Sequence, residues 1–230
     1  MQPTDTEESH PKNGRTAKFE RRRNEIIDLS ARLFAQHSFA GTGVAEISDE
    51  AGLGKGGLYY YIGSKETLLI EIHERVMDPL IEATARIEAI DSSPLIRLRL
   101  ISETLLQVAS DRPDHLWVFM HEYRALHGEL LDRFRRRRRQ YEEVVFKLFE
   151  QGAAEGAFQI EDVRITVLGF LGMHNFAYQW LRADGPLTTR EISEAFCRIF
   201  FEGITDGSGA IGAVADDLDQ YRHLAALHWT

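Results

Sequence analysis

The sequence predicts an all-α protein in which an N-terminal three-helix unit with a helix-turn-helix precedes a larger helical body. Three observations predict this class. The chain has 230 residues, 43% of them hydrophobic, which is enough to bury a sizeable core. It has only six prolines, and no segment of any length alternates apolar and polar residues as a half-buried strand would. A glycine-bearing turn, Gly52-Leu53-Gly54, separates two short helical segments near the N-terminus.

The expected helices follow from the spacing of apolar residues and from prolines and glycines at helix boundaries. Pro94, Pro113 and Gly185-Pro186 mark starts and stops, and Gly156 ends a helix. Pro79 falls inside the fourth helix, where it predicts a kink or a break around residues 75–78. The main helices are expected near 18–37, 44–51, 55–61, 64–90, 94–110, 114–127, 129–155, 161–182 and 188–206.

The two ends of the chain differ in character. Residues 1–14 are polar and are expected to be a disordered tail that leads into basic residues. Residues 209–230 form a C-terminal tail in which Val214, Leu218, Tyr221 and Leu224 are spaced for one helical face. This spacing predicts a further helix that docks on the body.

The segment after the glycine turn has the features of a helix that reads DNA. Leu58 points inward, while lysine, glycine and tyrosine residues occupy the early turns and the exposed sides. Glycine lets backbone amides approach phosphate or base closely, and the positive end of the helix dipole favours an anion. In a helix-turn-helix the second helix enters the major groove with its N-terminal residues against base edges. The alternative is that the tyrosines are packing residues and the glycines only form a loop.

Charge is segregated along the chain. The net formal charge is −9, yet basic residues cluster immediately before the helix-turn-helix, at Lys12, Arg15, Lys18, Arg21, Arg22 and Arg23. A basic arm beside a candidate reading helix is the electrostatic footprint expected for a polyanion, whereas the acidic remainder would face away from it. A solvated tail is the alternative for the part before Lys18.

Residues 20 to 70 resemble the TetR family of bacterial transcriptional regulators. The resemblance rests on an ordered set of motifs: Phe39, Thr42, Val44, Ile47-Ser48, Ala51-Gly52-Leu53-Gly54, Gly56-Gly57-Leu58-Tyr59-Tyr60-Tyr61-Ile62 and Ser64-Lys65-Glu66-Thr67-Leu68. It implies a DNA-binding domain over residues 15–66 and a ligand-binding and dimerisation domain over residues 67–208. It also implies DNA-contact roles for Thr42, Lys55, Gly56, Gly57, Tyr59, Tyr60, Tyr61 and Lys65, with Lys65 on backbone phosphate.

Four positions depart from the family pattern. Gly54, Gly57 and Tyr61 stand where the family usually places Ser, Thr and His, and Gly43 replaces the usual hydroxyl N-cap. Losing a hydroxyl at position 57 removes a hydrogen bond to base or phosphate. The operator sequence therefore cannot be borrowed from a relative.

The body carries bulky aromatic residues and methionine at helical spacing. Such residues are typical of either an ordinary hydrophobic core or a ligand pocket, and the side chains that end in a polar group favour the pocket. The candidate ligand-binding residues are Trp117, Met120, Tyr123, Tyr141, Val145, Phe149, Phe170, Met173, His174 and Trp180.

The segment 169–188 is similar to a TetR branch that represses fatty-acid and steroid catabolism and responds to acyl-CoA thioesters. This similarity implies a small hydrophobic effector such as an acyl-CoA. The run Arg135–Arg139 with Arg133 would attract the nucleotide phosphates, or it is simply a solvated, salt-bridged face.

Small and aromatic residues late in the chain suggest close helix packing. By resemblance, the eighth and ninth helices of two chains form a four-helix interface of a homodimer over a palindromic operator. The candidate interface residues are Gly169, Gly172, Phe196, Ile199, Phe200 and Gly203.

The resulting expectation is a ligand-responsive repressor that binds double-stranded operator DNA as a dimer. An activator, or a DNA binder without an inducer, remains open, and a small helical enzyme is the alternative from another class. Against an enzyme, His115, His121 and His127 rotate around a helix instead of converging, and no known metal or nucleophile motif is present. No catalytic residue, metal or cofactor is therefore expected. A single cysteine, Cys197, a polar N-terminus and the lack of a long apolar run predict a cytoplasmic protein without a membrane segment.

Overall fold

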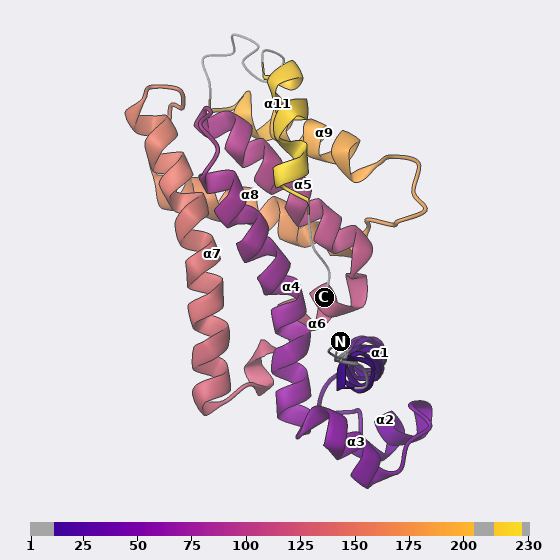
Figure 1. Cartoon of the computed structure of the whole chain (residues 1–230). Helices are drawn as coiled ribbons and strands as arrows, with labels where there is room; N and C mark the ends of the chain where they lie inside the picture. The colour runs from indigo at the N-terminus through magenta and orange to yellow at the C-terminus, as the bar shows by residue number, and fades with distance from the viewer. Residues whose placement is uncertain (1–11, 205–213, 227–230) are drawn as a thin grey trace, which may run out of the picture.

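The computed structural model describes residues 12–204 and 214–226, and within them every regular element is a helix, as the sequence predicts. The N-terminal head consists of α1 (Lys12–His37), α2 (Val44–Glu50) and α3 (Lys55–Ile62). The body contains α4 (Lys65–Glu88), α5 (Pro94–Asp111), α6 (Pro113–His121), α7 (Gly128–Ala154), α8 (Val163–Asn175), α9 (Thr189–Phe201) and α11 (Ala215–Tyr221) (Figure 1). Short 3-10 turns follow three of these helices, η1 (Tyr123–Ala125), η2 (Phe176–Gln179) and η3 (Arg222–Leu224).

Helix starts are fixed by local chemistry that the sequence displays. Ser64, Ser93, Asp162 and Thr188 each accept a hydrogen bond from a backbone amide in the first turn of the helix that follows. Pro94 and Pro113 begin α5 and α6, where the missing amide hydrogen costs nothing.

Three expectations about helix extent are corrected. Helix α1 begins at Lys12, so residues 12–14 are helical instead of part of a disordered tail, while residues 1–11 lie outside the described residues. The expected helix 114–127 ends at His121, because the chain then turns to bury Leu126 in the head. The expected helix 161–182 gives way to η2 after Asn175, and the turn buries Ala177 and Leu181. Apolar periodicity cannot reveal such breaks, because apolar residues lie on both sides of them.

Helix α4 joins the head to the body. It passes through Pro79 without ending, so the expected break is absent, and the helix continues to Glu88. It packs against α7 over a long stretch, and Figure 1 shows the two helices side by side down the length of the body. A displacement of α4 relative to α7 would therefore change the position of the head.

Two apolar clusters divide the molecule. The head cluster contains Ile27, Phe34, Ile47 and Leu58, and it extends past residue 66 into the first turns of α4 and to Val118, Leu126 and Phe134 of the body. The body cluster surrounds α5, which packs against α4, α7, α8, α9 and α11. The head is thus packed against α6 and the start of α7 instead of standing alone on a linker.

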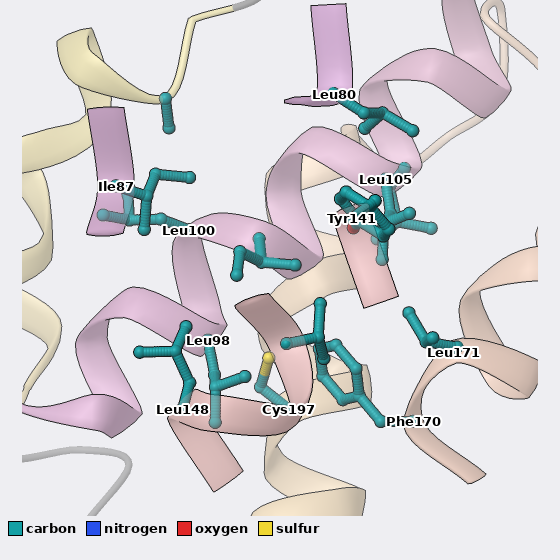
Figure 2. Packing of buried hydrophobic residues seen from close by; sticks show 14 of the residues in the cluster. Leu80, Ile87, Leu98, Leu100, Leu105, Tyr141, Leu148, Phe170, Leu171 and Cys197 are labelled. Atoms are coloured by element: carbon teal, nitrogen blue, oxygen red, sulfur yellow. The ribbon is translucent and has the colours of Figure 1, made fainter. Parts of the chain in front are cut away.

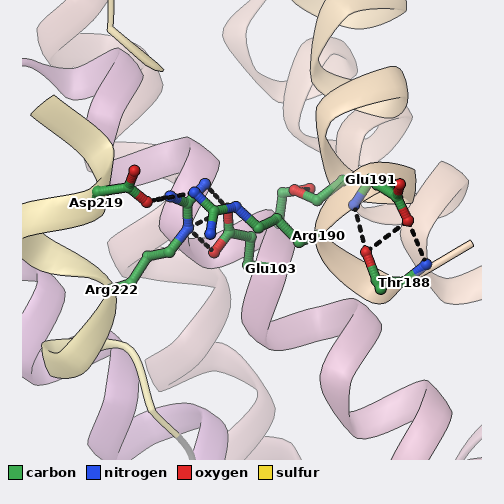
Figure 3. A network of polar contacts seen from close by, with 8 residues as sticks. Glu103, Thr188, Arg190, Glu191, Asp219 and Arg222 are labelled. Carbon is green, nitrogen blue, oxygen red and sulfur yellow. Dashed lines mark hydrogen bonds and ion pairs between the residues drawn. The ribbon is translucent and has the colours of Figure 1, made fainter. Parts of the chain in front are cut away.

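The C-terminal helix docks on the body, as its spacing predicts. Leu218 is fully buried, and Tyr221 and Leu224 pack against the body cluster. Arg222 donates two hydrogen bonds of 2.9 Å to the carboxylate of Glu103 on α5, and Asp219 pairs with both Arg222 and Arg190 of α9 (Figure 3). Residues 209–213 and 227–230 of the expected tail lie outside the described residues. In the described part of the chain, no helix has both the length and the apolar character needed to span a membrane.

Candidate nucleic-acid interface and ligand cavity

Helix α3 presents a polar, aromatic and glycine-bearing surface. Leu58 and Ile62 anchor it in the head core, while Lys55, Gly56, Tyr59 and Tyr60 face outward, Tyr60 with 71% of its surface exposed. A side chain added at Gly56 would meet open space, so the glycine keeps the first turn of the helix accessible at its backbone. Amides at such a helix start are suited to bind a phosphate.

The turn before α3 needs glycine. Gly52 has a φ of +62°, a left-handed conformation that residues with a Cβ rarely adopt. Gly54 is the N-cap in an extended conformation, and Leu53 between them is half-buried against the head. This geometry sets the angle between α2 and α3, as the helix-turn-helix pattern predicts.

Helix α1 supports the tyrosines of α3. The ring of Phe19 stacks on Tyr61 with centroids 5.0 Å apart, and it meets Tyr60 edge-on at 5.3 Å. Tyr61 is half-buried by these contacts. Of the three consecutive tyrosines, Tyr59 and Tyr60 are therefore the exposed ones, and Tyr61 packs α3 against α1. The sequence reasoning did not identify Phe19, which lies outside the family motifs that it used.

Two residues expected on the DNA surface are engaged by the head itself, Thr42 fully buried and Lys65 half-buried. Thr42 is fully buried, and its hydroxyl donates to the carbonyl of Ser38 at 2.9 Å. The Lys65 ammonium donates to the carbonyl of Phe39 and lies 4.2 Å from the centroid of the Phe39 ring. Burial lowers the pKa of Lys65. Lys65 thus holds the loop between α1 and α2 against α4, and Thr42 bonds within that loop.

The basic residues of α1 likewise divide into those that bond within the head and those that are exposed. Arg22 donates to the carbonyl of Ala51, and Arg23 pairs with Glu71 and donates to the carbonyl of Tyr61 at 3.1 Å. These two side chains fasten α1 to α2, α3 and α4. Lys18 and Arg21 are exposed on α1, whereas the side chains of Lys12 and Arg15 lie outside the described part.

A small apolar cavity lies between α4, α5, α6, α7 and α8 in the body. It holds about 40 Å³, far below the roughly 300–1,000 Å³ of a pocket for a drug-sized ligand. Figure 2 shows Leu80, Leu105, Tyr141 and Leu171 in this part of the core. Its lining residues are Val76, Met77, Leu80, Leu105, Val108, Leu116, Phe119, Arg138, Tyr141, Glu142, Leu171, His174 and Asn175.

The cavity includes two of the ten candidate ligand residues, Tyr141 and His174. Val145, Phe149 and Phe170 lie in the solid core of the body, where Phe149 and Phe170 pack edge to face with centroids 5.5 Å apart. Trp117 stacks on His121, and Tyr123 stacks on Phe134 beside the head. Met120 packs at the edge of the body core, Met173 is half-buried, and Trp180 is exposed. The residues from α4 and α5 were missed because their apolar spacing is the same as that of any core helix.

His174 belongs to a buried polar chain. Its Nδ1 lies 2.7 Å from the carbonyl of Phe170, so Nδ1 carries the hydrogen and Nε2 accepts from the hydroxyl of Ser102 at 2.6 Å. The Ser102 hydroxyl lies 2.8 Å from that of Ser193 on α9. Burial lowers the pKa of His174 to about 4, so the ring is neutral at physiological pH.

The arginine run is partly paired and partly open. Arg133 donates to Glu74 at 2.7 Å and Arg137 pairs with Asp78, so both tie α7 to α4. Arg135, Arg138 and Arg139 line an open groove of about 270 Å³ with Tyr123, Leu131, Phe134 and Glu142. Arg138 and Glu142, which pair at 2.7 Å, line both this groove and the apolar cavity. A basic surface therefore adjoins the cavity mouth.

Helices α8 and α9 carry an exposed apolar face. Ile199 is 72% exposed, and Gly169, Gly172 and Gly203 are exposed as well. Phe196 and Phe200 instead point partly inward, with Phe196 against His174 and Phe200 against Phe170. The sequence reasoning missed Ile165, Leu168 and Phe176, which are exposed on the same part of the body. The i, i+3 spacing of Ile165 and Leu168 on α8 was the available signal, whereas Phe176 lies in η2.

A helix-turn-helix with an exposed reading helix, joined by one continuous helix to an α-helical body, defines a DNA-binding transcriptional regulator. Two family models match the chain: residues 26–72 match the bacterial regulatory proteins of the tetR family, and residues 91–204 match the tetracyclin repressor-like C-terminal domain. The chain belongs to the TetR family.

Relatives and solved structures agree with this assignment over most of the chain. The transcriptional repressor KstR2 of Mycolicibacterium smegmatis is 25% identical over 190 residues, which cover 82% of this chain and 93% of the relative. The structure of the ketosteroid regulator KstR2 of Mycobacterium tuberculosis is 26% identical, with a TM-score of 0.75 over 80% of this chain and 95% of that one. The structure of AibR in complex with isovaleryl coenzyme A and operator DNA is 27% identical, with a TM-score of 0.70 over 78% of this chain and 98% of that one.

Proposed function

We propose that this regulator is a dimeric repressor that binds a palindromic operator and is released by a hydrophobic CoA thioester. The ligand class is inferred from the apolar cavity and the basic groove, which share part of their lining. Arg138 and Glu142 line both the apolar cavity and the basic groove of Arg135 and Arg139. An apolar acyl chain and an anionic carrier would each find a matching surface on either side of this pair.

The chemistry of the two surfaces suits the two ends of such a molecule. The cavity wall is mainly aliphatic, from Val76 to Leu171, and favours an acyl chain through burial. Arginine binds phosphate through several donors in a fixed plane. Arg135 and Arg139 are exposed, and the pair of Arg135 with Asp132 is a long, exposed one of 3.9 Å. The resemblance to KstR2, and to AibR with its bound isovaleryl coenzyme A, supports the same class.

The small volume of the cavity suggests how binding would act on DNA. An acyl chain can enter a space of about 40 Å³ only if its walls move apart. Met77 and Leu80 of α4 form part of the wall, and α4 also leads to the head. Ligand would therefore favour a body shape in which α4 is displaced, and this works only if the ligand binds that shape better than the DNA-binding one.

The exposed face of α8 and α9 would form the dimer interface. Ile165, Leu168, Phe176 and Ile199 place large apolar side chains in contact with water, which is favourable to bury against a second copy. A two-fold dimer would present two α3 helices to DNA half-sites about 34 Å apart. The small exposed residues Gly169 and Gly172 would allow the partner helices to approach closely.

The first test is selection of bound sequences from a random DNA pool at fixed salt without added ligand, followed by release assays on the selected site. Enrichment of a palindrome supports the repressor proposal. Isovaleryl-CoA, octanoyl-CoA, the two free acids and CoA alone would then be compared for release. Release by thioesters but not by the acids or CoA is expected. A palindrome without release by any compound would favour a DNA binder without this inducer.

The arginine surface provides a matched variant pair. Arg135→Ala with Arg139→Ala should weaken release by the thioesters, because both side chains line the groove. Arg136→Ala removes another exposed arginine of the same helix that does not line the groove. Equal effects of the two changes would argue against a phosphate site in this groove.

A further inference from the structure

The hydroxyl group of Tyr141 is buried in the core of the body. Tyr141 is 5% exposed, and its oxygen has no hydrogen-bond partner among the described residues. The side chain lines the apolar cavity, and Figure 2 shows it beside Leu105. A buried hydroxyl without a hydrogen bond costs free energy compared with one in water. Burial also raises the pKa of Tyr141 strongly, which keeps the hydroxyl protonated and able to donate.

Two neighbouring polar groups of the lining are already engaged. Both ring nitrogens of His174 have partners, the carbonyl of Phe170 and the hydroxyl of Ser102. Arg138 donates to Glu142 at 2.7 Å. The hydroxyl of Tyr141 can therefore donate a hydrogen bond to a ligand from a cavity wall that is mostly aliphatic. His174 differs, because both of its ring nitrogens already have partners within the protein.

The position of Tyr141 on α7 indicates which oxygen it would meet. Tyr141 lies between Arg138 and Glu142, the pair at the boundary of cavity and groove. Arg135 precedes it by six residues, which is about 9 Å along a helix axis, and the arginine side chain extends farther. A CoA molecule with its phosphates at the arginines would thus pass its flexible arm over this boundary. The thioester group joins that arm to the acyl chain, so its carbonyl oxygen would lie at this boundary.

We infer that the Tyr141 hydroxyl donates a hydrogen bond to the thioester carbonyl of the effector at the boundary between groove and cavity. This inference rests on the proposed CoA-thioester function and deepens it. It makes Tyr141 a specificity-determining residue, because a compound with the same chain but no carbonyl leaves the hydroxyl unpaired. The site then distinguishes an acyl thioester from an alkyl thioether of equal size and charge.

The test compares each thioester with its thioether. Binding of isovaleryl-CoA and S-isopentyl-CoA, and of octanoyl-CoA and S-octyl-CoA, is measured by calorimetry on the full chain. The wild type should prefer each thioester by roughly fivefold to tenfold, the range of one hydrogen bond. Tyr141→Phe should lose this preference through weaker thioester binding, with thioether binding unchanged. Tyr178→Phe, which removes a hydroxyl outside the cavity that lies 3.2 Å from His121, should keep the preference.

Three outcomes would overturn the inference. Equal weakening of thioester and thioether binding by Tyr141→Phe would assign Tyr141 to packing, and the proposed CoA-thioester function would stand. Failure of the wild type to bind any of the four compounds would remove that function and the inference with it. A lower melting temperature of ligand-free Tyr141→Phe would show that the hydroxyl already has a partner within the protein. The expected melting temperature is equal to or above that of the wild type.

Discussion

Arg75 of α4 and Asp28 of α1 form an ion pair of 2.8 Å that joins the body to the head. The side chain of Arg75 is almost fully enclosed, and Asp28 also meets Arg112 at 3.3 Å and His115 at 3.2 Å. Burial alone would raise the pKa of Asp28, but the hydrogen bond to His115 and the charge of Arg75 together lower it. The Asp28 carboxylate therefore contacts three basic side chains, Arg75 of α4, Arg112 just before α6 and His115 of α6.

Asp28→Asn should lower the free energy of unfolding by about 1 kcal/mol or less, because it removes the carboxylate that pairs with Arg75 and because Asp28 itself is half exposed to screening solvent. Since the folded pKa of Asp28 is lowered, the contribution is present above the unfolded pKa and is lost as pH falls below about 4. Urea unfolding at neutral pH measures the change. Asp91→Asn, at an exposed carboxylate after α4, is the control and should have little effect. Equal stability of the two variants would show that the ion pair does not hold head and body together.

Lys65→Ala should destabilise the head without removing a phosphate contact. The Lys65 ammonium is bound to Phe39, so its loss should lower the melting temperature and weaken operator binding at all salt concentrations alike. Lys55→Ala should leave stability unchanged and reduce the slope of log affinity against log salt by about 0.9, the value for one phosphate. Fluorescence anisotropy at several salt concentrations distinguishes the two. A reduced slope for Lys65→Ala would return that residue to the DNA surface.

Tyr59→Ala should affect operator binding more than binding to random DNA. Tyr59 is exposed on α3 and contributes to the reading surface, and a lost base contact costs about 1–3 kcal/mol in specific binding only. Tyr61→Ala should instead weaken both and lower stability, because its ring stacks on Phe19. Competition assays with operator and random duplexes measure the difference. The same ratio of affinities in both variants would argue against this division of roles.

Ile199→Glu should prevent dimer formation. A charge on the exposed apolar face of α9 would have to be buried against the partner without an ion pair, at a cost of several kcal/mol. Sedimentation velocity should show a monomer with an unchanged helical circular dichroism spectrum, and operator affinity should fall. Glu194→Gln, at an exposed side chain five residues earlier on α9, is the control. A dimeric Ile199→Glu protein would place the interface elsewhere.

His73→Leu should raise stability and reduce its dependence on pH. Both ring nitrogens of His73 are buried, with no hydrogen-bond partner in the part of the chain that the structure describes, and the ring contacts Phe119 and Phe134. Burial lowers its pKa to about 3. A histidine with a lowered folded pKa imposes no protonation penalty above its unfolded pKa of 6.5, and it destabilises the fold increasingly as pH falls below that value. The wild type should therefore lose roughly 2 kcal/mol from this residue between about pH 7 and pH 5. Urea unfolding of the wild type and the variant at both pH values measures it, and parallel losses would contradict the assignment.

The sequence by itself determined the all-α class, the helix-turn-helix and the docking of the C-terminal helix. These follow from local rules: Gly52 permits a left-handed turn, Ser64 and Thr188 cap helices, and the spacing of Leu218 and Tyr221 marks one helical face. Local rules depend on neighbours in the chain, so they can be applied without knowledge of distant segments.

Only the tertiary structure decided which polar side chains face outward. Lys65 and Thr42 look like surface residues in their motifs, yet Lys65 binds the carbonyl of Phe39, which is 26 residues away, and Thr42 is fully buried and bonded to Ser38 of its own loop. The cavity likewise combines residues of α4 and α5 with Tyr141, which no spacing along one helix could reveal. Side-chain environment is set by contacts between segments far apart in sequence, and those contacts exist only once the helices have packed.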